Sequence, residues 1–239
     1  MTKALLLKLG TALSLAALIT ACSEDGAPPA HAEPAPLSTP RPVAADLPPG
    51  DGFDFYVLSL SWSPSYCRAE DAGANPQQCA EDRDFGFVVH GLWPQYESGY
   101  PEFCPSREPE RVPWQLGRKY IDIVPSMGLI GHQWRKHGSC SGLSQADYFR
   151  VLRAARDRVV IPASFKLQNL PLEIDAPDAE GAFVSANPGM VAEGIAISCK
   201  RGLLREVRIC MTPTLDFRAC RAVDRAGCTI DKLEVPEPD

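Results

Sequence analysis

Residues 53–62, FDFYVLSLSW, are aromatic and aliphatic and contain one charged residue, Asp54. Segments of this composition fit a pleated, buried surface, so the sequence predicts a buried strand here. The segment 85–89, FGFVV, predicts a second strand that ends directly at His90. A polar loop carrying Cys67 and Cys79 joins the two. These two strands form the starting point for the fold class.

Downstream of these strands the pattern changes to helix and then back to strand. Residues 144–159 follow helical spacing after an N-terminal cap signal from Ser144 and Asp147. A shorter helix is expected to end before Pro188, and 194–200 and 203–210 predict strands joined by a turn at Arg201 and Gly202. Strand and helix do not alternate regularly, so the sequence predicts an α+β fold whose central antiparallel sheet is flanked by helices.

The chain begins with a segment typical of export. Residues 1–21 place Lys3 and Lys8 before a short apolar run, which predicts a signal peptide. The run ends in ITAC, which resembles a bacterial lipoprotein cleavage box with Cys22 as the lipidated residue. The alternative is ordinary cleavage after the Ala30 to Ala32 segment without a lipid. We therefore expect an exported, periplasmic protein, with or without a membrane anchor.

The region that follows is unsuited to a core. Residues 23–52 contain eight prolines and show no apolar periodicity, so 22–52 is expected to be a flexible linker. The folded, catalytic domain is then expected to span 53–239.

Nine cysteines are present. Setting Cys22 aside leaves eight, which in an exported protein favours four disulfides. No CxxC or CxxH pair occurs, which argues against a zinc site. Composition alone leaves the pairing open.

The formal net charge is −6. A protein that grips nucleic acid along a groove is usually basic, so tight, non-specific binding is not expected. A local positive site could still process nucleic acid.

Cationic residues gather in one short stretch, 132–140, HQWRKHGSC. Of the four histidines, His31 lies in the predicted linker, His132 and His137 lie in this stretch, and His90 opens HGLWPQ at 90–95. A zinc protease motif would need a glutamate after the first histidine, and no G-x-S-x-G elbow presents a serine nucleophile. Histidines with a lysine favour phosphoryl chemistry, in which imidazoles move protons while cations hold the phosphate.

HGLWPQ and HQWRKHGSC resemble the two active-site signatures of the ribonuclease T2 family, and 53–67 is similar to that family's first strand. The resemblance runs from Phe53 to Cys228. It implies a disulfide-bonded ribonuclease T2-like fold and a metal-independent endoribonuclease of low sequence specificity that needs no cofactor. Single-stranded RNA would be its substrate and partner. DNA, which lacks the 2′-OH nucleophile, would be untouched.

The resemblance also implies roles. His137 would be the base that deprotonates the 2′-OH, and His90 the acid that protonates the leaving 5′-oxygen. His132 would bind phosphate and Lys136 would stabilise the pentacoordinate state. Which of the two proton-transfer histidines is acid and which is base stays open, because their roles reverse in the second, hydrolytic step.

Base binding involves less specific positions. The resemblance implies that Trp93 stacks on a base, whereas an aromatic residue after a strand is commonly part of a core. Gln95 occupies a position where some family members carry an acidic residue, so base preference stays open. Tyr100 or Tyr96 could close the base pocket. Trp134 and Arg135 are assigned no chemistry. Gly138 is expected to stop a helix.

The resemblance further implies four disulfides. The pairs are Cys67 with Cys79, Cys104 with Cys140, Cys199 with Cys228, and Cys210 with Cys220.

Gln133 departs from the family pattern, which commonly has glutamate there. Losing that carboxylate should lower the pKa of the neighbouring histidines, so that the base stays neutral at more acidic pH. A rival hypothesis follows from the same departure: a catalytically weakened envelope protein that binds RNA or a protein partner. The retained His90, Lys136 and His137 argue against it. We expect a monomer.

Overall fold

The structure is a computed structural model that describes residues 46–70, 73–80, 82–166 and 169–238. The predicted signal peptide, Cys22 and the linker up to residue 45 lie outside the described residues. Within them, no helix is both long enough and apolar enough to cross a bilayer.

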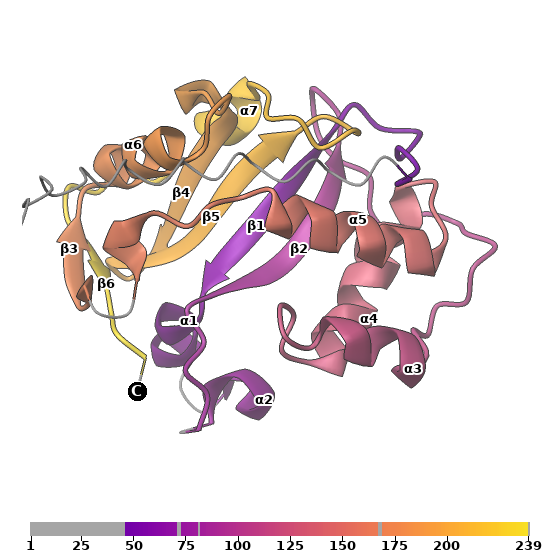
Figure 1. The fold of residues 1–239 in the computed structure, drawn as a ribbon, viewed down its shortest axis with the longest axis horizontal. Coiled ribbons are helices and arrows are strands. Elements are labelled where there is room, and N and C mark those ends of the chain that lie inside the picture. The colour runs from indigo at the N-terminus through magenta and orange to yellow at the C-terminus, as the bar shows by residue number, and fades with distance from the viewer. Residues whose placement is uncertain (1–45, 71–72, 81, 167–168, 239) are drawn as a thin grey trace, which may run out of the picture. The chain divides into compact units, whose positions relative to one another are not determined.

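A six-stranded sheet forms the centre of the domain (Figure 1). Its strands are β1 (Phe55–Trp62), β2 (Phe87–Gln95), β3 (Leu172–Ile174), β4 (Ile195–Lys200), β5 (Leu203–Met211) and β6 (Leu233–Val235). The order is β2-β1-β5-β6-β3, and β4 also pairs with β5. All pairings are antiparallel except that of β5 with β6, so the sheet is mixed and not purely antiparallel as expected.

Helices flank this sheet. They are α1 (Ser63–Glu70), α2 (Pro76–Cys79), α3 (Trp114–Gly117), α4 (Met127–Lys136), α5 (Gln145–Asp157), α6 (Ala176–Ala186) and α7 (Arg221–Asp224). The Ser144 hydroxyl accepts a hydrogen bond from the Asp147 backbone N–H at 3.1 Å and so caps α5, as its sequence predicts. The end of α6 before Pro188 and the α+β class are likewise confirmed.

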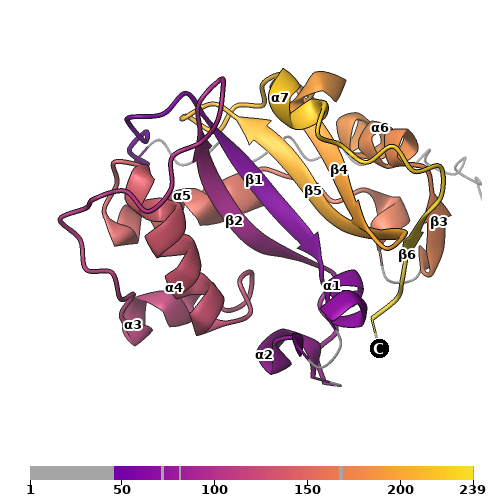
Figure 2. The same cartoon turned by 180° about the vertical axis from the view of Figure 1, so that it is seen from behind.

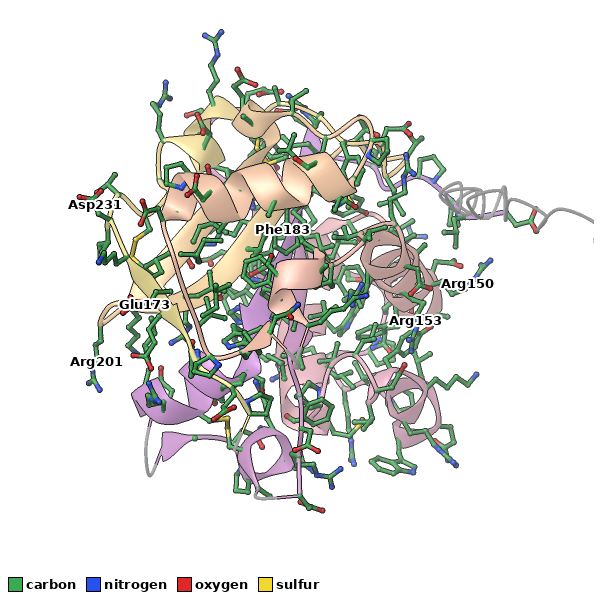
Figure 3. The ribbon with its side chains drawn as sticks, turned by 60° about the vertical axis from the view of Figure 1, so that its left-hand side comes forward. Arg150, Arg153, Glu173, Phe183, Arg201 and Asp231 are labelled. Atoms are coloured by element: carbon green, nitrogen blue, oxygen red, sulfur yellow. A yellow bond between two sulfur atoms is a disulfide. The ribbon has the colours of Figure 1, made fainter. Side chains whose placement is uncertain are left out.

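The two faces of the sheet differ. The helices α5 and α6 cover one face (Figure 1), whereas the turned view shows β2, β1 and β5 free of helices across most of the other (Figure 2). Alternation along β1 sends Tyr56, Leu58, Leu60 and Trp62 into the main core under the helices. Phe183 of α6 is fully buried in that core, while Arg150 and Arg201 project outward (Figure 3).

Strand β2 is longer than predicted. It continues through the whole of HGLWPQ to Gln95, so the expectation that it ends at His90 is wrong. Two features allow this extension. A bulge shifts its register against β1 between Ser59 and Leu60, and Pro94 is tolerated because β2 is an edge strand. The first motif therefore lies on the sheet and not in a loop.

Strands β4 and β5 form a hairpin at the predicted turn. Arg201 and Gly202 both have positive φ, 54° and 80°, which suits a tight two-residue connection. This hairpin places β5 in the middle of the sheet, next to β1.

Residues just before the predicted domain start also contact the domain. Leu47 packs against the main core, and the Asp51 backbone N–H donates to the carbonyl of Ser141 at 2.9 Å. The end of the predicted linker thus lies against the loop that follows the second motif.

Four disulfides join Cys67 to Cys79, Cys104 to Cys140, Cys199 to Cys228, and Cys210 to Cys220. This is the pairing that the family resemblance implies. The bridge between Cys210 and Cys220 attaches the end of β5 to the start of α7, which borders the open face of the sheet.

Candidate active site

The second motif forms the last turn of α4 and the residues after it. Ser126 caps the helix by accepting a hydrogen bond from the Leu129 backbone N–H at 3.0 Å. His132 and Lys136 are one helical turn apart and share a face of α4. The helix ends at Lys136, so His137 is its C-cap, with a non-helical φ of −121°.

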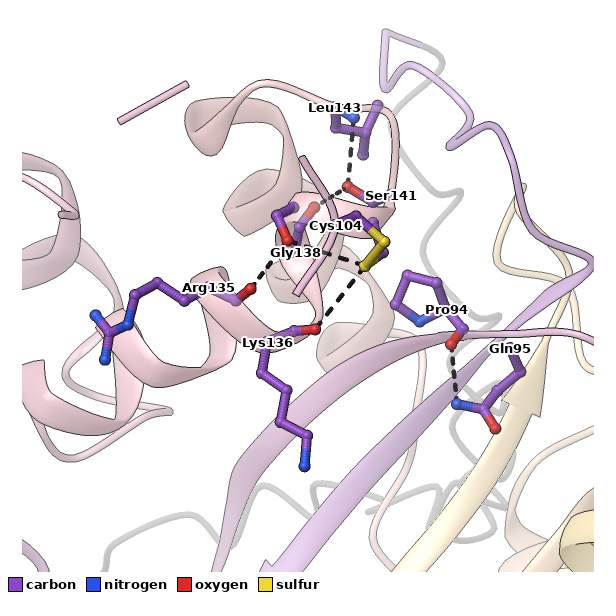
Figure 4. Close-up of a disulfide and its surroundings, with 10 residues drawn as sticks. Pro94, Gln95, Cys104, Arg135, Lys136, Gly138, Ser141 and Leu143 are labelled. Atoms are coloured by element: carbon purple, nitrogen blue, oxygen red, sulfur yellow. Dashed lines mark hydrogen bonds between the residues drawn. A yellow bond between two sulfur atoms is a disulfide. The ribbon is translucent and has the colours of Figure 1, made fainter. Parts of the chain in front are cut away.

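A disulfide holds the end of α4 in place (Figure 4). Cys140 ends a single 3₁₀ turn and is bridged to Cys104, in the loop that follows the first motif. The Phe103 backbone N–H also donates to the Lys136 carbonyl at 2.9 Å. From this anchored end the Lys136 side chain extends toward the strands (Figure 4).

Helix α4 ends just before Gly138, as its sequence predicts, and Gly138 also serves packing. A Cβ there would lie 2.6 Å from the ring of Trp134 and 2.9 Å from that of Tyr148. Trp134 is fully buried and donates its indole N–H to the Pro109 carbonyl at 2.9 Å, while Arg135 is exposed. Both were assigned no chemistry, and Trp134 fixes α4 against the core.

His90 is the extra residue at the bulge in β2: Val89 pairs with Leu60 and Gly91 pairs with Ser59, which leaves His90 unpaired. Bulges re-aim side chains, and this one directs the imidazole across the open face of the sheet. The Nδ1 atom of His90 lies 2.6 Å from an oxygen of Glu206 on β5.

Gly91 makes room for a contact between the two motifs. A Cβ at this position would lie 2.0 Å from the side-chain oxygen of Gln133 and 2.2 Å from the indole nitrogen of Trp93. Those two atoms form a hydrogen bond, in which the indole N–H donates to Gln133 at 2.9 Å. Gln133 is buried, and its side-chain oxygen is satisfied by Trp93.

Trp93 lies between the two histidines expected to move protons. Its ring centroid is 5.3 Å from that of His90, edge to face, and 5.4 Å from that of His137. The Arg208 guanidinium lies 5.7 Å from the same ring. Trp93 therefore spaces the catalytic candidates and also borders the cavity where a base could lie.

All the residues assigned to catalysis and base binding line one cavity of about 450 Å³. These are His90, Trp93, Gln95, Tyr100, His132, Gln133, Lys136 and His137. The fold thus brings together two motifs that are about forty residues apart in the chain.

Sequence reasoning missed part of this lining. Phe55, Val57, Arg208 and the α7 residues Ala222 and Val223 also border the cavity. For Arg208 a signal existed: Glu206 and Arg208 are two residues apart in LLREVRICM and flank Val207, which indicates that one face of β5 is not all core.

Burial and positive charge act on the two histidines of the second motif. Burial, together with Lys136, His132 and His90, lowers the pKa of His137 to about 3. Burial and the charges of Lys136, Arg135 and His90 also lower the pKa of His132. A pKa of about 3 leaves the His137 ring neutral at neutral pH, as a general base must be.

Lys136 remains available to a ligand. Its ammonium lies 3.4 Å from a carboxylate oxygen of Glu102, and both side chains are partly exposed. Exposed ion pairs of this kind are weak, on the order of 0–1 kcal/mol, so an incoming phosphate could compete for the ammonium.

The residues expected to bind a base show different placements. Gln95 donates its side-chain amide to the neighbouring Pro94 carbonyl at 2.9 Å (Figure 4), which leaves its amide oxygen for a ligand. Tyr100 and Tyr96 are 57% and 42% exposed and both line the cavity.

Within the described ranges, no group of three or more His, Cys, Asp or Glu side chains is arranged to hold a metal ion. The cavity is lined by three imidazoles and one ammonium. Such a set can take a proton from one side of an anion, return one on the other and stabilise charge between them.

Comparison with known proteins assigns this arrangement to a family. Residues 53–220 match the model of the Ribonuclease T2 family. A ribonuclease of Aeromonas hydrophila is 36% identical over 196 residues, covering 78% of this chain and 84% of the relative. A probable ribonuclease of Haemophilus influenzae is 41% identical over 108 residues, covering 40% of this chain and 39% of the relative.

The fold agrees with this assignment. An RNase-related protein from Calystegia sepium superposes with a TM-score of 0.63 at 21% identity, over 79% of this chain and all of the other. The chain belongs to the ribonuclease T2 family.

Proposed function

We propose that this ribonuclease T2-type enzyme cleaves single-stranded RNA by intramolecular transesterification, without a metal ion. The observation that carries the proposal is the convergence of His90, His132, Lys136 and His137 on one cavity. A neutral imidazole, a second imidazole and an ammonium are the groups that this reaction needs.

In the first step the ribose 2′-OH loses its proton to His137 as its oxygen bonds to phosphorus. The bond from phosphorus to the 5′-oxygen breaks, and His90 donates a proton to that oxygen. The products are a 2′,3′-cyclic phosphate and a free 5′-hydroxyl. Water can then open the cyclic phosphate to a 3′-phosphate, with the two histidines in reversed roles.

The structure supports His137 as the base in two ways. Its pKa of about 3 keeps it neutral down to acidic pH. Its Nδ1 is buried without a partner among the described residues, which makes Nε2 the nitrogen that can meet a substrate.

Charge builds on the phosphate oxygens in the transition state. Lys136 and His132 lie on one face of α4 and border the cavity, so they are placed to bind these oxygens. Lys136 supplies positive charge to the phosphate and His132 can donate a hydrogen bond to it, which is the reason we propose that no metal is required.

The base 5′ to the cleaved bond would lie against Trp93, Tyr100 and Gln95. Stacking contributes about 1–3 kcal/mol for any base, because every base has a π-face. Of these three side chains only Gln95 carries an amide. Few hydrogen bonds could therefore select one base over another, and we propose low sequence specificity.

A chimeric substrate tests this function directly. An oligodeoxynucleotide carrying one ribonucleotide should be cut in excess EDTA only at the ribose. The same oligonucleotide with a 2′-O-methyl group at that position should stay intact. Cleavage of the methylated strand, or loss of cleavage on adding EDTA, would contradict the mechanism.

The second candidate is an envelope protein of this family that binds RNA or a protein partner without turnover. Only Gln133 favours it, and Gln133 keeps its hydrogen bond to Trp93. Binding of the RNA strand without cleavage between pH 4 and pH 8 would establish this alternative.

Export is proposed from the sequence of residues 1–21, and lipidation from Cys22. The enzyme would act as a monomer on RNA in the periplasm of a Gram-negative bacterium, tethered by its proline-rich linker. Cells fed radiolabelled palmitate should label the wild type but not Cys22→Ser. Equal labelling of both would exclude lipidation at this residue.

A further inference from the structure

A buried carboxylate lies under the cavity and takes no part in the mechanism above. Glu206 of β5 is 4% exposed, although it is charged. Isolated buried charges are costly, so such a group is retained only with partners. Its partners are two residues of the site.

Both oxygens of Glu206 are engaged. One lies 2.6 Å from His90 Nδ1, and the other accepts hydrogen bonds from the Arg208 guanidinium at 2.8 and 3.0 Å. Burial raises the pKa of Glu206, but the His90 hydrogen bond and the Arg208 charge outweigh it and lower this pKa to about 2. The carboxylate is therefore an anion at neutral pH and can only accept from His90.

The contact crosses the sheet. His90 is on β2 and Glu206 on β5, with β1 between them. The β1 residue paired with Glu206 is Ser61, and the residue paired with Arg208 is Ser59. These small side chains leave the space over β1 open, and the bulge at His90 aims the ring across it.

Because Nδ1 donates to Glu206, Nε2 is the ring nitrogen left for the substrate. An imidazole held by one nitrogen has a fixed tautomer and a fixed ring plane, which is how a carboxylate orients a catalytic histidine in other enzymes. Arg208 extends the arrangement, since its guanidinium also lies over Trp93, the ring next to His90.

We propose that Glu206 is a positioning residue for His90: it accepts the Nδ1 proton, so that the Nε2 proton points at the leaving 5′-oxygen. This inference rests on the proposed function. In the cleavage step the Nε2 proton passes to the 5′-oxygen as the P–O5′ bond breaks, and the Nδ1 proton stays between His90 and Glu206.

The substitution Glu206→Gln tests the role. Arg208 donates two hydrogen bonds to the side chain, so the glutamine oxygen should turn to Arg208 and its NH₂ to His90 Nδ1. An NH₂ group cannot accept the Nδ1 proton, so His90 would lose the tautomer and the ring orientation that it needs as the acid. Losing a charge-assisted hydrogen bond of this kind should lower kcat on a dinucleoside monophosphate about 10- to 100-fold, with little change in KM.

A second substrate separates positioning from general damage. In a nucleoside 3′-(4-nitrophenyl phosphate) with the same base, the leaving nitrophenolate is stable without a proton. Glu206→Gln should therefore cleave this ester within about threefold of the wild type, because the acid is no longer needed. A merely structural role would lower both rates equally.

Glu180→Gln is the matched control. Glu180 is a partly buried glutamate of α6 that accepts a hydrogen bond from the Ile197 backbone N–H at 2.9 Å and lies outside the cavity lining. This variant should cleave both substrates at the wild-type rate.

A measurement on the unaltered protein covers the case in which Glu206→Gln does not fold. In ¹⁵N-histidine-labelled wild type, with the signals of His90 assigned by their loss in His90→Ala, Nδ1 should carry a hydrogen-bonded proton at pH 7. An unprotonated Nδ1, or equal loss on both substrates in Glu206→Gln, would overturn the proposal. A wild type that cleaves neither substrate would instead overturn the proposed function, while the Nδ1 signal would still decide the role of Glu206.

Discussion

Alternate residues of β1 face two different environments. Tyr56, Leu58, Leu60 and Trp62 lie in a large core under α5 and α6. Val57 and Phe55 belong to a small cluster with Cys210 and Cys220 on the other face, where Ser59 and Ser61 leave space for the polar site. One face of the sheet thus supplies stability and the other supplies the floor of the active site.

This comparison suggests why the second face needs covalent support. Its apolar cluster is much smaller than the main core, so burial contributes less there. The disulfides Cys104–Cys140 and Cys210–Cys220 attach the end of α4 and the start of α7 beside it. Each such bridge contributes typically about 2–4 kcal/mol, mainly by restricting the unfolded chain.

The largest effect should come from removing the base on the open face. His137→Ala should lower kcat on RNA about 10²- to 10⁴-fold, the usual contribution of a positioned general base. Urea denaturation should show that the variant is folded. Retention of more than about a tenth of the wild-type kcat would mean that another group takes the proton.

A substitution on the covered face should lower stability and leave kcat unchanged. Leu58→Ala should reduce the free energy of unfolding by about 2–5 kcal/mol, because it leaves a cavity in the main core. Below the melting temperature, kcat per folded molecule should be unchanged. Val57→Ala, one residue away, is the control: it should lose less stability and change KM, since Val57 lines the cavity.

The buried histidine also predicts how stability depends on pH. The pKa of His137 is about 3 in the folded protein, below its ordinary value of 6.5, so the unfolded chain takes up this proton first as pH falls. The contribution of His137 to the free energy of unfolding is fully present above pH 6.5 and is lost progressively as pH falls toward 3. Denaturation curves at several pH values should show a smaller acid-induced loss in His137→Gln than in wild type. Identical losses would contradict the low pKa.

The smallest effect should come from restoring the family's carboxylate. Gln133→Glu can keep the hydrogen bond from Trp93 while adding negative charge beside His137 and His132. The charge should raise the pKa of both rings and move the acid limb of the pH–rate profile to higher pH, with a rate gain of up to about tenfold. A profile that stays in place or moves to lower pH would contradict this role for position 133.

Local sequence was informative where chemistry and secondary structure are local. The spacing of the apolar residues and the Ser144 cap predict α5, and the two compact motifs locate every residue assigned to proton transfer. The family resemblance added the disulfide pairs, which composition left open.

What could not be predicted depends on contacts between distant strands. The sequence predicts that the second strand stops at His90, whereas β2 continues past it through a bulge. A bulge with an unpaired histidine has no local sequence signature. Glu206 and Arg208 lie more than a hundred residues from His90 and meet it only because β5 pairs with β1. The role of Gln133 as the partner of Trp93 likewise depends on Gly91, which comes from the other motif.

The proposed reaction requires His90 and His137, which the fold brings together on the open face, to cut RNA through its own 2′-oxygen. The most direct measurement is the mass of the product ends after the purified, oxidised chain has acted briefly on single-stranded RNA in excess EDTA. We expect 2′,3′-cyclic phosphate and 5′-hydroxyl ends, which should be absent with His137→Ala. Ends carrying a 5′-phosphate, or equal product from His137→Ala, would contradict it.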